Sequence, residues 1–131
     1  MRLTVLPCRV AICRLPADAP VPAWAWQGNL CSVTRTPAEL SVVTDEAAVP
    51  VGVSCSSGWR VLEVAGPLAL EMTGVLASLA APLGGAGISL FAVSTFDTDY
   101  ILVQEGKLAD AIAALRMASN EIEYERVPDG K

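Results

Sequence analysis

The residue types that carry out most enzyme chemistry are sparse in this sequence. It has no histidine and four cysteines: Cys8, Cys13, Cys31 and Cys55. No C-x-x-C pair occurs, so a zinc site is not indicated, and we interpret the cysteines as small apolar residues in the reduced state. Cys55, in the stretch VSCSSGW, is the single candidate nucleophile, and it has no evident base. We therefore expect no metal, no cofactor and no enzymatic activity.

One short stretch concentrates polar groups that suit binding better than catalysis. STFDTDYILV (residues 94–103) places two aspartates and two threonines in a tight corner between apolar segments. Such a corner offers hydrogen-bond donors and acceptors to a ligand. The alternative is an ordinary turn, in which Asp97 bonds its own backbone two residues on and Asp99 only holds the turn.

Composition excludes several partners. The chain has 131 residues, 53% of them apolar, which fits one ordinary domain or two very small ones. The net charge is −5 and no window gathers lysines and arginines, so nucleic acid is not an expected partner. The uncharged residues 72–96 are broken by Pro82 and four glycines, which argues against a membrane span. Pro7, Arg9 and Arg14 interrupt the start of the chain, so we predict no signal peptide and a cytoplasmic location.

The second half of the sequence predicts a complete βαββαβ unit. The apolar residues Val75, Leu76, Leu79, Ala80 and Leu83 have helical spacing, and Gly84 and Gly85 are expected to end that helix. The pattern predicts helices covering one face of an antiparallel sheet, hence an α+β fold. The expected elements are a strand at 59–65, a helix at 73–83, strands at 88–95 and 99–103, a helix built on Leu108, Ala111, Ile112 and Leu115, and a strand at 121–127.

A weaker copy of this unit precedes it. Residues 30–47 align with residues 90–107 at an offset of 60, which pairs Glu39 with Asp99. Residues 9–16 align with 60–67 at an offset of 51, so about nine residues of the first helix are missing from the first copy.

The segment PADAPVPAWAWQGN leaves the first copy at most one turn of helix, because prolines interrupt it. We expect Trp24 and Trp26 to cover its small core. DEAAVPVG has room for one turn in place of the second helix. The predicted division is residues 1–58 and 59–128; chance similarity between short apolar strands is the alternative.

A duplicated βαββαβ unit with these motifs resembles the ACT-domain family, and in particular small bacterial tandem-ACT proteins related to the cytosolic arginine sensors of the animal TOR pathway. The resemblance covers residues 6–127 and rests on GVLASLAAPL, AGIS, STFDTDYILV and SVTRTPAELSVV. It implies two ferredoxin-like (βαββαβ) ACT units in tandem, the first with degenerate helices. It also implies regulatory binding of a small ligand, usually an amino acid, and side-by-side pairing, hence a homodimer.

The resemblance also implies where a ligand binds. One group of contacts opens the first helix of the second unit, and the other is the polar turn. At the helix start, Gly74 lets a ligand carboxylate approach the backbone N–H groups, which the helix dipole favours. Asp99 can accept charge-assisted hydrogen bonds from the α-amino group. The implied residues are Met72, Thr73, Gly74, Val75, Ser94, Thr95, Phe96 and Asp99.

Two departures and one alternative qualify this expectation. The arginine sensors carry a carboxylate at the position of Met72, so an apolar or small amino acid suits this sequence better than arginine. The sensors have two tandem pairs where this chain has one, which a homodimer would restore. Thr73 can also be read as a simple helix cap. The alternative function is a protein–protein assembly module without ligand. The sequence names neither the amino acid nor a downstream effector.

Overall fold

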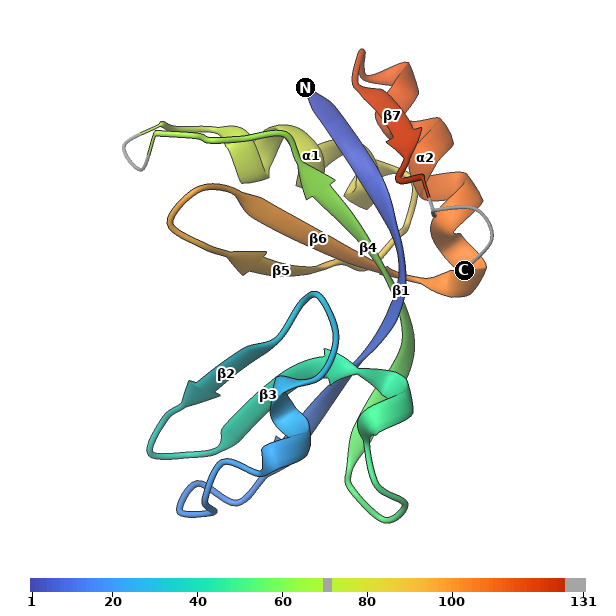
Figure 1. The fold of residues 1–131 in the computed structure, drawn as a ribbon. Helices are drawn as coiled ribbons and strands as arrows, with labels where there is room; N and C mark the ends of the chain where they lie inside the picture. Colours follow the sequence, from blue (N-terminus) through green and yellow to red (C-terminus); the bar gives the residue numbers. More distant parts are fainter. Residues whose placement is uncertain (70–71, 127–131) are drawn as a thin grey trace. The chain divides into compact units, whose positions relative to one another are not determined.

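The computed structural model describes residues 1–69 and 72–126. They form two compact units, which we call unit 1 (Met1–Pro7 with Arg60–Lys131) and unit 2 (Cys8–Trp59). Strands β1 (Arg2–Leu15) and β4 (Cys55–Val64) are each divided between the two units (Figure 1). The division into residues 1–58 and 59–128 stays a prediction. The structure groups residues 1–7 with the second half of the sequence, in unit 1.

Unit 1 has the predicted βαββαβ order. Its strand order is β5-β6-β4-β1, and β7 pairs with β1 in parallel, Arg2 opposite Glu121. Residues of β1 therefore lie between β4 and β7, an insertion that the sequence did not indicate. The elements are β4, α1 (Val75–Gly85), β5 (Phe91–Ser94), β6 (Asp99–Gln104), the short 3₁₀ turn η3 (Glu105–Lys107), α2 (Leu108–Met117) and β7 (Glu121–Tyr124).

Both helices of unit 1 cover the same face of its sheet, as predicted. Alternate residues of each strand point to that face, and helix residues three or four apart meet them. Each fully buried leucine in this core stabilises the fold by roughly 1.5–3 kcal/mol. The core includes Leu62, Val64, Ile101 and Val103 from the sheet and Leu79, Leu83, Ala111 and Leu115 from the helices.

The end of α1 differs from the prediction. Gly84 and Gly85 lie inside the helix instead of ending it. The chain turns at Gly87, which has a φ of 74°. The Ile88 N–H donates to the carbonyl of Leu83 at 2.9 Å, a bond typical of a glycine-terminated helix.

Unit 2 contains the same strand pattern with only short helical turns. Its strand order is β2-β3-β1-β4. The elements beside β1 and β4 are η1 (Ala23–Trp26), β2 (Ser32–Arg35), β3 (Leu40–Asp45) and η2 (Glu46–Ala48). The 3₁₀ turns η1 and η2 stand where α helices occur in unit 1, which confirms the predicted shortening. Trp24 packs on the small core as expected. Trp26 does not, since it is 58% exposed.

The alignment offset of 60 between the two hairpins is wrong by one residue. In unit 1, Ser94 lies opposite Asp99, and in unit 2, Arg35 lies opposite Leu40. The corresponding residues are therefore 59 apart, and the counterpart of Asp99 is the buried Leu40, not Glu39. Because strand side chains alternate, a shift of one residue moves every side chain to the other face.

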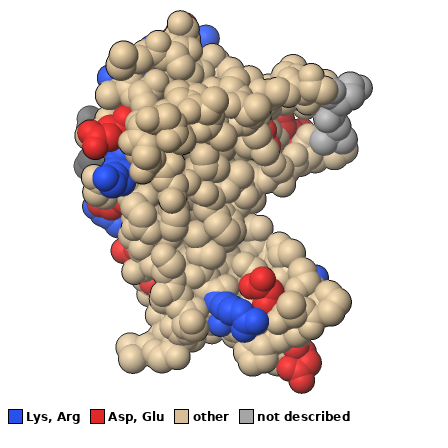
Figure 2. Space-filling model, turned by 180° about the vertical axis from the view of Figure 1, so that it is seen from behind, with Lys and Arg blue, Asp and Glu red and all other residues tan. Residues whose placement is uncertain are grey.

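Across residues 1–69 and 72–126, no helix combines the length and apolar character that crossing a bilayer requires. In the same residues, no three acidic, cysteine or histidine side chains gather as metal ligands. Charged side chains are scattered over the face drawn in Figure 2, which shows no basic patch and is mostly uncharged. Nothing on that face suits a phosphate backbone.

Candidate ligand-binding site

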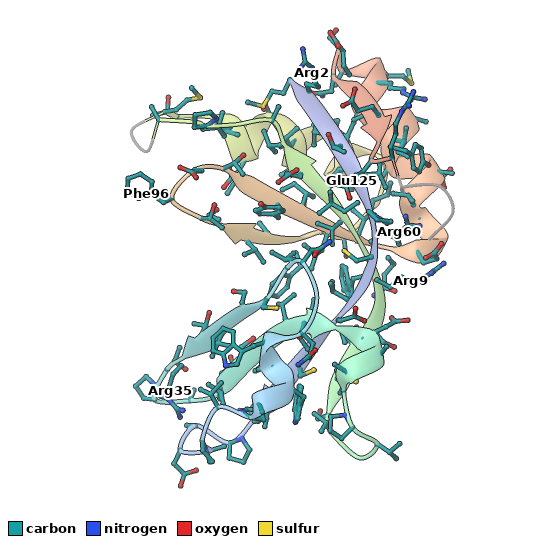
Figure 3. All side chains as sticks on the ribbon, viewed as in Figure 1. Arg2, Arg9, Arg35, Arg60, Phe96 and Glu125 are labelled. Atoms are coloured by element: carbon teal, nitrogen blue, oxygen red, sulfur yellow. The ribbon has the colours of Figure 1, made fainter. Side chains whose placement is uncertain are left out.

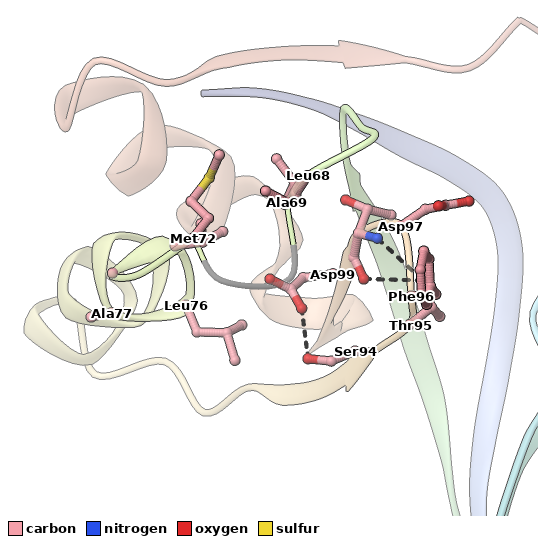
Figure 4. A pocket seen from close by; sticks show the side chains of 13 residues that line it. Leu68, Ala69, Met72, Leu76, Ala77, Ser94, Thr95, Phe96, Asp97 and Asp99 are labelled. Carbon is pink, nitrogen blue, oxygen red and sulfur yellow. Dashed lines mark hydrogen bonds between the residues drawn. The ribbon is translucent and has the colours of Figure 1, made fainter.

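A pocket of about 360 Å³ opens in unit 1 between the start of α1 and the turn that joins β5 to β6 (Figure 4). It brings together seven of the eight predicted site residues: Met72, Gly74, Val75, Ser94, Thr95, Phe96 and Asp99. Thr73 is not one of the described residues that line it. The N-cap of α1 is Gly74, so Thr73 is not the helix cap either.

The β5–β6 turn is held by a threonine. The Thr95 N–H donates to the carbonyl of Thr98 at 2.8 Å, and the Thr98 N–H donates to the Thr95 hydroxyl at 3.3 Å. The Thr95 hydroxyl donates to the same carbonyl at 3.1 Å. Thr95 thus makes the side-chain bond to the turn backbone that was expected from Asp97. Its hydroxyl is therefore already hydrogen-bonded within the turn.

Two further bonds attach this turn to the end of β4 and to the segment that follows it. The Thr98 hydroxyl is buried and donates to the carbonyl of Val64 at 2.6 Å. The carbonyl of Asp97 accepts from the Leu68 N–H, also at 2.6 Å. A Cβ at Gly66 would come within 3.0 Å of that carbonyl, so glycine permits the close approach. The backbone of the turn is therefore held in place before any ligand arrives.

The opposite wall is the start of α1. Gly74 has a φ of 79°, a left-handed conformation that favours glycine over other residues. An added Cβ at Gly74 would meet no described atom within 4 Å, so this stretch of backbone is open. The first N–H groups of an α helix have no partner within the helix, and the positive end of the helix dipole favours an anion there.

Asp99 supplies negative charge from the other wall. It accepts a hydrogen bond from the Ser94 hydroxyl at 2.6 Å, and its carboxylate points into the pocket (Figure 4). Asp97 also lines the pocket, and among the described residues no lysine or arginine lines it. The pocket thus combines two carboxylates with a helix N-terminus, which suits a ligand with both a cationic and an anionic group.

The carboxylates near this wall also affect Tyr100. Burial raises the pKa of Tyr100, and the hydrogen bond from its hydroxyl to Glu63, 2.9 Å long, raises it further. The negative charges of Glu63 and Asp97 act in the same direction. Because the phenolate would form beside two carboxylates, Tyr100 holds its proton to a higher pH than an ordinary tyrosine does.

The rest of the lining is apolar and partly exposed. Met72 is 49% exposed and Leu76 is 38% exposed, both on the α1 side. Phe96 is 77% exposed and projects at the tip of the β5–β6 hairpin (Figure 3). Large apolar side chains left open around a concave site offer contact area to an apolar group.

Several lining residues were not predicted. The helical spacing of Leu76 predicts that it lies on the buried face of α1, but Leu76 lines the pocket instead. Leu68 and Ala69 carried no sequence signal, since their position depends on the bond from Leu68 to the turn. The unpredicted lining residues are Leu68, Ala69, Leu76, Ala77, Asp97 and Thr98. Glu71, the carboxylate that precedes Met72 in the sequence, lies outside the described residues.

Comparisons with known proteins agree with this fold. Residues 54–117 match the family model of the ACT domain, and residues 9–52 match a second family model, described as an N-terminal domain. A crystal structure of an Agobacterium tumefaciens protein is 35% identical, covers 99% of this chain and 97% of its own, and superposes with a TM-score of 0.91.

Two further proteins are similar over a shorter stretch or at lower identity. The human cytosolic arginine sensor for mTORC1 subunit 1 is 37% identical over 67 residues, which are 49% of this chain but only 20% of the sensor. The regulatory subunit of aspartate kinase from Thermus thermophilus has a TM-score of 0.58 at 11% identity, covering 88% of this chain and 93% of that one. The second likeness concerns the fold alone. From the family model and the observed fold together, residues 54–117 of this chain belong to the ACT-domain family.

Proposed function

We propose that this chain is a regulatory module that binds an α-amino acid in the pocket of unit 1. The observation that carries the proposal is the placement of the Asp99 carboxylate opposite the start of α1 in one pocket. The ligand's ammonium group would bind Asp99 through charge-assisted hydrogen bonds. Its carboxylate would accept from the N–H groups that follow Gly74. The arginine sensor among the relatives supports an amino-acid ligand.

The side chain of the ligand is proposed to be apolar. Met72, Leu68 and Leu76 line the pocket, and an apolar side chain would remove their exposed surface from water. Asp97 is the group that would favour a cationic side chain instead. Acidic amino acids are disfavoured, because the described part of the lining offers the carboxylates of Asp97 and Asp99 and no basic residue.

We also propose that unit 2 is a degenerate ACT unit and that the chain acts as a homodimer. The β2-β3-β1-β4 order of unit 2 and its matching hairpin register support the duplication. Strand β5 ends the strand order of unit 1, so its outer edge is available for pairing with a second copy. Analytical ultracentrifugation of the purified chain tests the dimer directly.

The experiment for the ligand is a thermal-unfolding screen against the twenty amino acids at millimolar concentration. A ligand at about 100 times its dissociation constant adds roughly 2.7 kcal/mol to the free energy of unfolding. For a chain of this size that is a shift of several degrees in Tm. We expect the largest shifts with apolar amino acids such as leucine and methionine, and no shift with glutamate.

Three variants make the result specific. Asp99→Asn keeps the size of the side chain and should abolish the shift, whereas Asp110→Asn, the same change at an exposed position of α2, should keep it. Asp97→Asn should leave the response to apolar amino acids intact. A shift confined to arginine and lost in Asp97→Asn would overturn the apolar assignment but keep the site.

Assembly without a ligand is the second candidate function, and one observation favours it. Phe96 is 77% exposed in the turn after β5, the last strand in the order of unit 1, and an open strand edge is a template for pairing with another chain. Phe96→Ala should weaken self-association under this reading. A stable dimer that responds to none of the twenty amino acids, and that dissociates in Phe96→Ala, would replace the sensor proposal with this one.

A further inference from the structure

Two cysteines lie opposite each other on neighbouring strands of unit 2. Strands β1 and β4 are paired, and the Arg14 N–H donates to the carbonyl of Ser54 at 2.9 Å. In an antiparallel ladder this bond places the preceding residue of one strand opposite the following residue of the other, which are Cys13 and Cys55. They form a pair without direct backbone hydrogen bonds, in which Cα atoms lie about 4.5 Å apart and side chains are close.

The two thiols are also near enough to affect each other. Cys55 is among the groups that raise the pKa of the Cys13 thiol. Both are free thiols. A Cα separation of about 4.5 Å falls within the range that a disulfide spans without backbone movement. The usual spacing of such a pair is therefore compatible with a disulfide.

The two thiols differ in accessibility. Cys13 is 1% exposed and belongs to the small core of unit 2, whereas Cys55 is exposed. Cys31 is held differently, because its thiol donates to the carbonyls of Gln27 at 3.2 Å and Gly28 at 3.7 Å. An external oxidant thus reaches Cys55 first, with Cys13 next to it to complete the reaction.

We propose that Cys13 and Cys55 are a redox-responsive pair that forms a reversible intramolecular disulfide. The oxidant is a small-molecule disulfide such as oxidised glutathione. The Cys55 thiolate attacks one of its sulfurs, which forms a mixed disulfide and releases one glutathione thiolate. Cys13 then loses its proton and attacks the Cys55 sulfur, which releases the second glutathione. Two protein thiols are oxidised and one external disulfide is reduced, so electrons and protons balance.

The bond would act on unit 2 as a whole. It would enclose residues 13–55, which is most of the unit that spans Cys8–Trp59. A crosslink of this kind stabilises mainly by restricting the unfolded chain. Oxidation would therefore stiffen unit 2 without using any residue of the pocket in unit 1.

Peptide mapping tests the proposal, because trypsin separates the four cysteines. Cleavage after arginine places Cys8 in residues 3–9, Cys13 in 10–14, Cys31 in 15–35 and Cys55 in 36–60. After incubation with oxidised glutathione, free thiols are blocked with N-ethylmaleimide under denaturing conditions. We expect a crosslinked species joining residues 10–14 to residues 36–60, and two blocked thiols instead of four.

Matched variants and a stability measurement complete the test. Cys31→Ser should retain the crosslink, and Cys55→Ser should lose it while its circular dichroism spectrum stays unchanged. The oxidised chain should melt several degrees higher than the reduced chain, and dithiothreitol should reverse the shift. Four blocked thiols after oxidation, or a crosslink through residues 3–9 or 15–35, would overturn the proposal.

Discussion

The two hairpins of this protein have the same turn but different surroundings. In unit 2, the Thr36 N–H donates to the carbonyl of Glu39 at 2.9 Å, and the Glu39 N–H donates to the Thr36 hydroxyl at 3.1 Å. Thr95 and Thr98 make the equivalent bonds in unit 1. The hairpin tips are marked by Arg35 and Phe96 in Figure 3. In both units, therefore, a threonine stabilises the hairpin turn through the same hydrogen bonds.

What differs is the element beside each turn. Unit 1 has the 11-residue helix α1, which begins at a left-handed glycine, and an aspartate at the first position of β6. Unit 2 has the four-residue turn η1 after Pro22, and the buried Leu40 at the position of Asp99. A polar turn therefore becomes a candidate site only where a full helix starts opposite it and a carboxylate faces the gap.

The largest expected effect concerns the core under α1. Leu79→Ala should lower the free energy of unfolding by about 2–5 kcal/mol, because Leu79 is fully buried between helix and sheet. Leu76→Ala on the same helix should cost less than about 1 kcal/mol, since Leu76 is partly exposed.

Two optical probes then tell whether the units unfold together. All three tryptophans lie in unit 2, and both α helices lie in unit 1. Because β1 and β4 contribute to both units, we expect Leu79→Ala to shift urea unfolding monitored by tryptophan fluorescence as much as unfolding monitored by helical circular dichroism. A shift seen only by circular dichroism would mean that the units unfold independently.

The start of α1 gives the next largest effect. Gly74→Ala should destabilise the protein by about 1–2 kcal/mol, because alanine is disfavoured at a φ of 79°. Gly84→Ala should stabilise it by roughly 0.5–1 kcal/mol, since Gly84 lies inside the helix and an added Cβ meets nothing within 4 Å. Chemical denaturation distinguishes the two signs. Destabilisation by both changes would contradict the helix boundaries described here.

The shared turn predicts a pair of similar, smaller effects. Thr95→Val and Thr36→Val should each lower the free energy of unfolding by roughly 0.5–1.5 kcal/mol, because each removes the hydroxyl that accepts a backbone N–H. Serine at either position should restore most of the loss. Urea unfolding of the four variants measures this, and a large cost at Thr95 alone would show that the two turns are not equivalent.

The last expected effect is a pH dependence, part of which originates in unit 2. Burial raises the pKa of the Cys13 thiol from 9.0 to about 11, and the negative charge and hydrogen bond of Cys55 add to the increase. The unfolded chain releases this proton near pH 9 and the folded chain holds it until about pH 11. The stability that Cys13 contributes is therefore fully present below pH 9, and it is lost as the pH rises through this window.

Unfolding of reduced protein at about pH 8 and about pH 10.5, followed by tryptophan fluorescence, measures this loss. Cys13→Val should show a smaller decrease over the same interval, because it lacks the titrating thiol. An equal decrease in the variant would mean that other groups account for the pH dependence.

Local patterns in the sequence determined which elements form. The spacing of Val75, Leu79 and Leu83 predicted α1, and the prolines before Trp24 predicted the short turn η1, because both depend on neighbouring residues. Most of the candidate pocket could also be predicted, since the resemblance pointed to the turn and to the helix start. These features require only backbone preferences and a match of apolar faces.

Tertiary structure alone decided which distant segments meet. The insertion of Arg2–Val5 between β4 and β7, the hairpin offset of 59 instead of 60, and the meeting of Cys13 with Cys55 depend on hydrogen bonds between strands far apart in sequence. The sequence of an apolar strand does not show which neighbour it pairs with. A shift of one residue in register leaves the composition unchanged but moves every side chain to the other face of the sheet. Only the folded ladder therefore shows that Asp99 corresponds to Leu40, and that one hairpin faces a pocket while the other packs on a core.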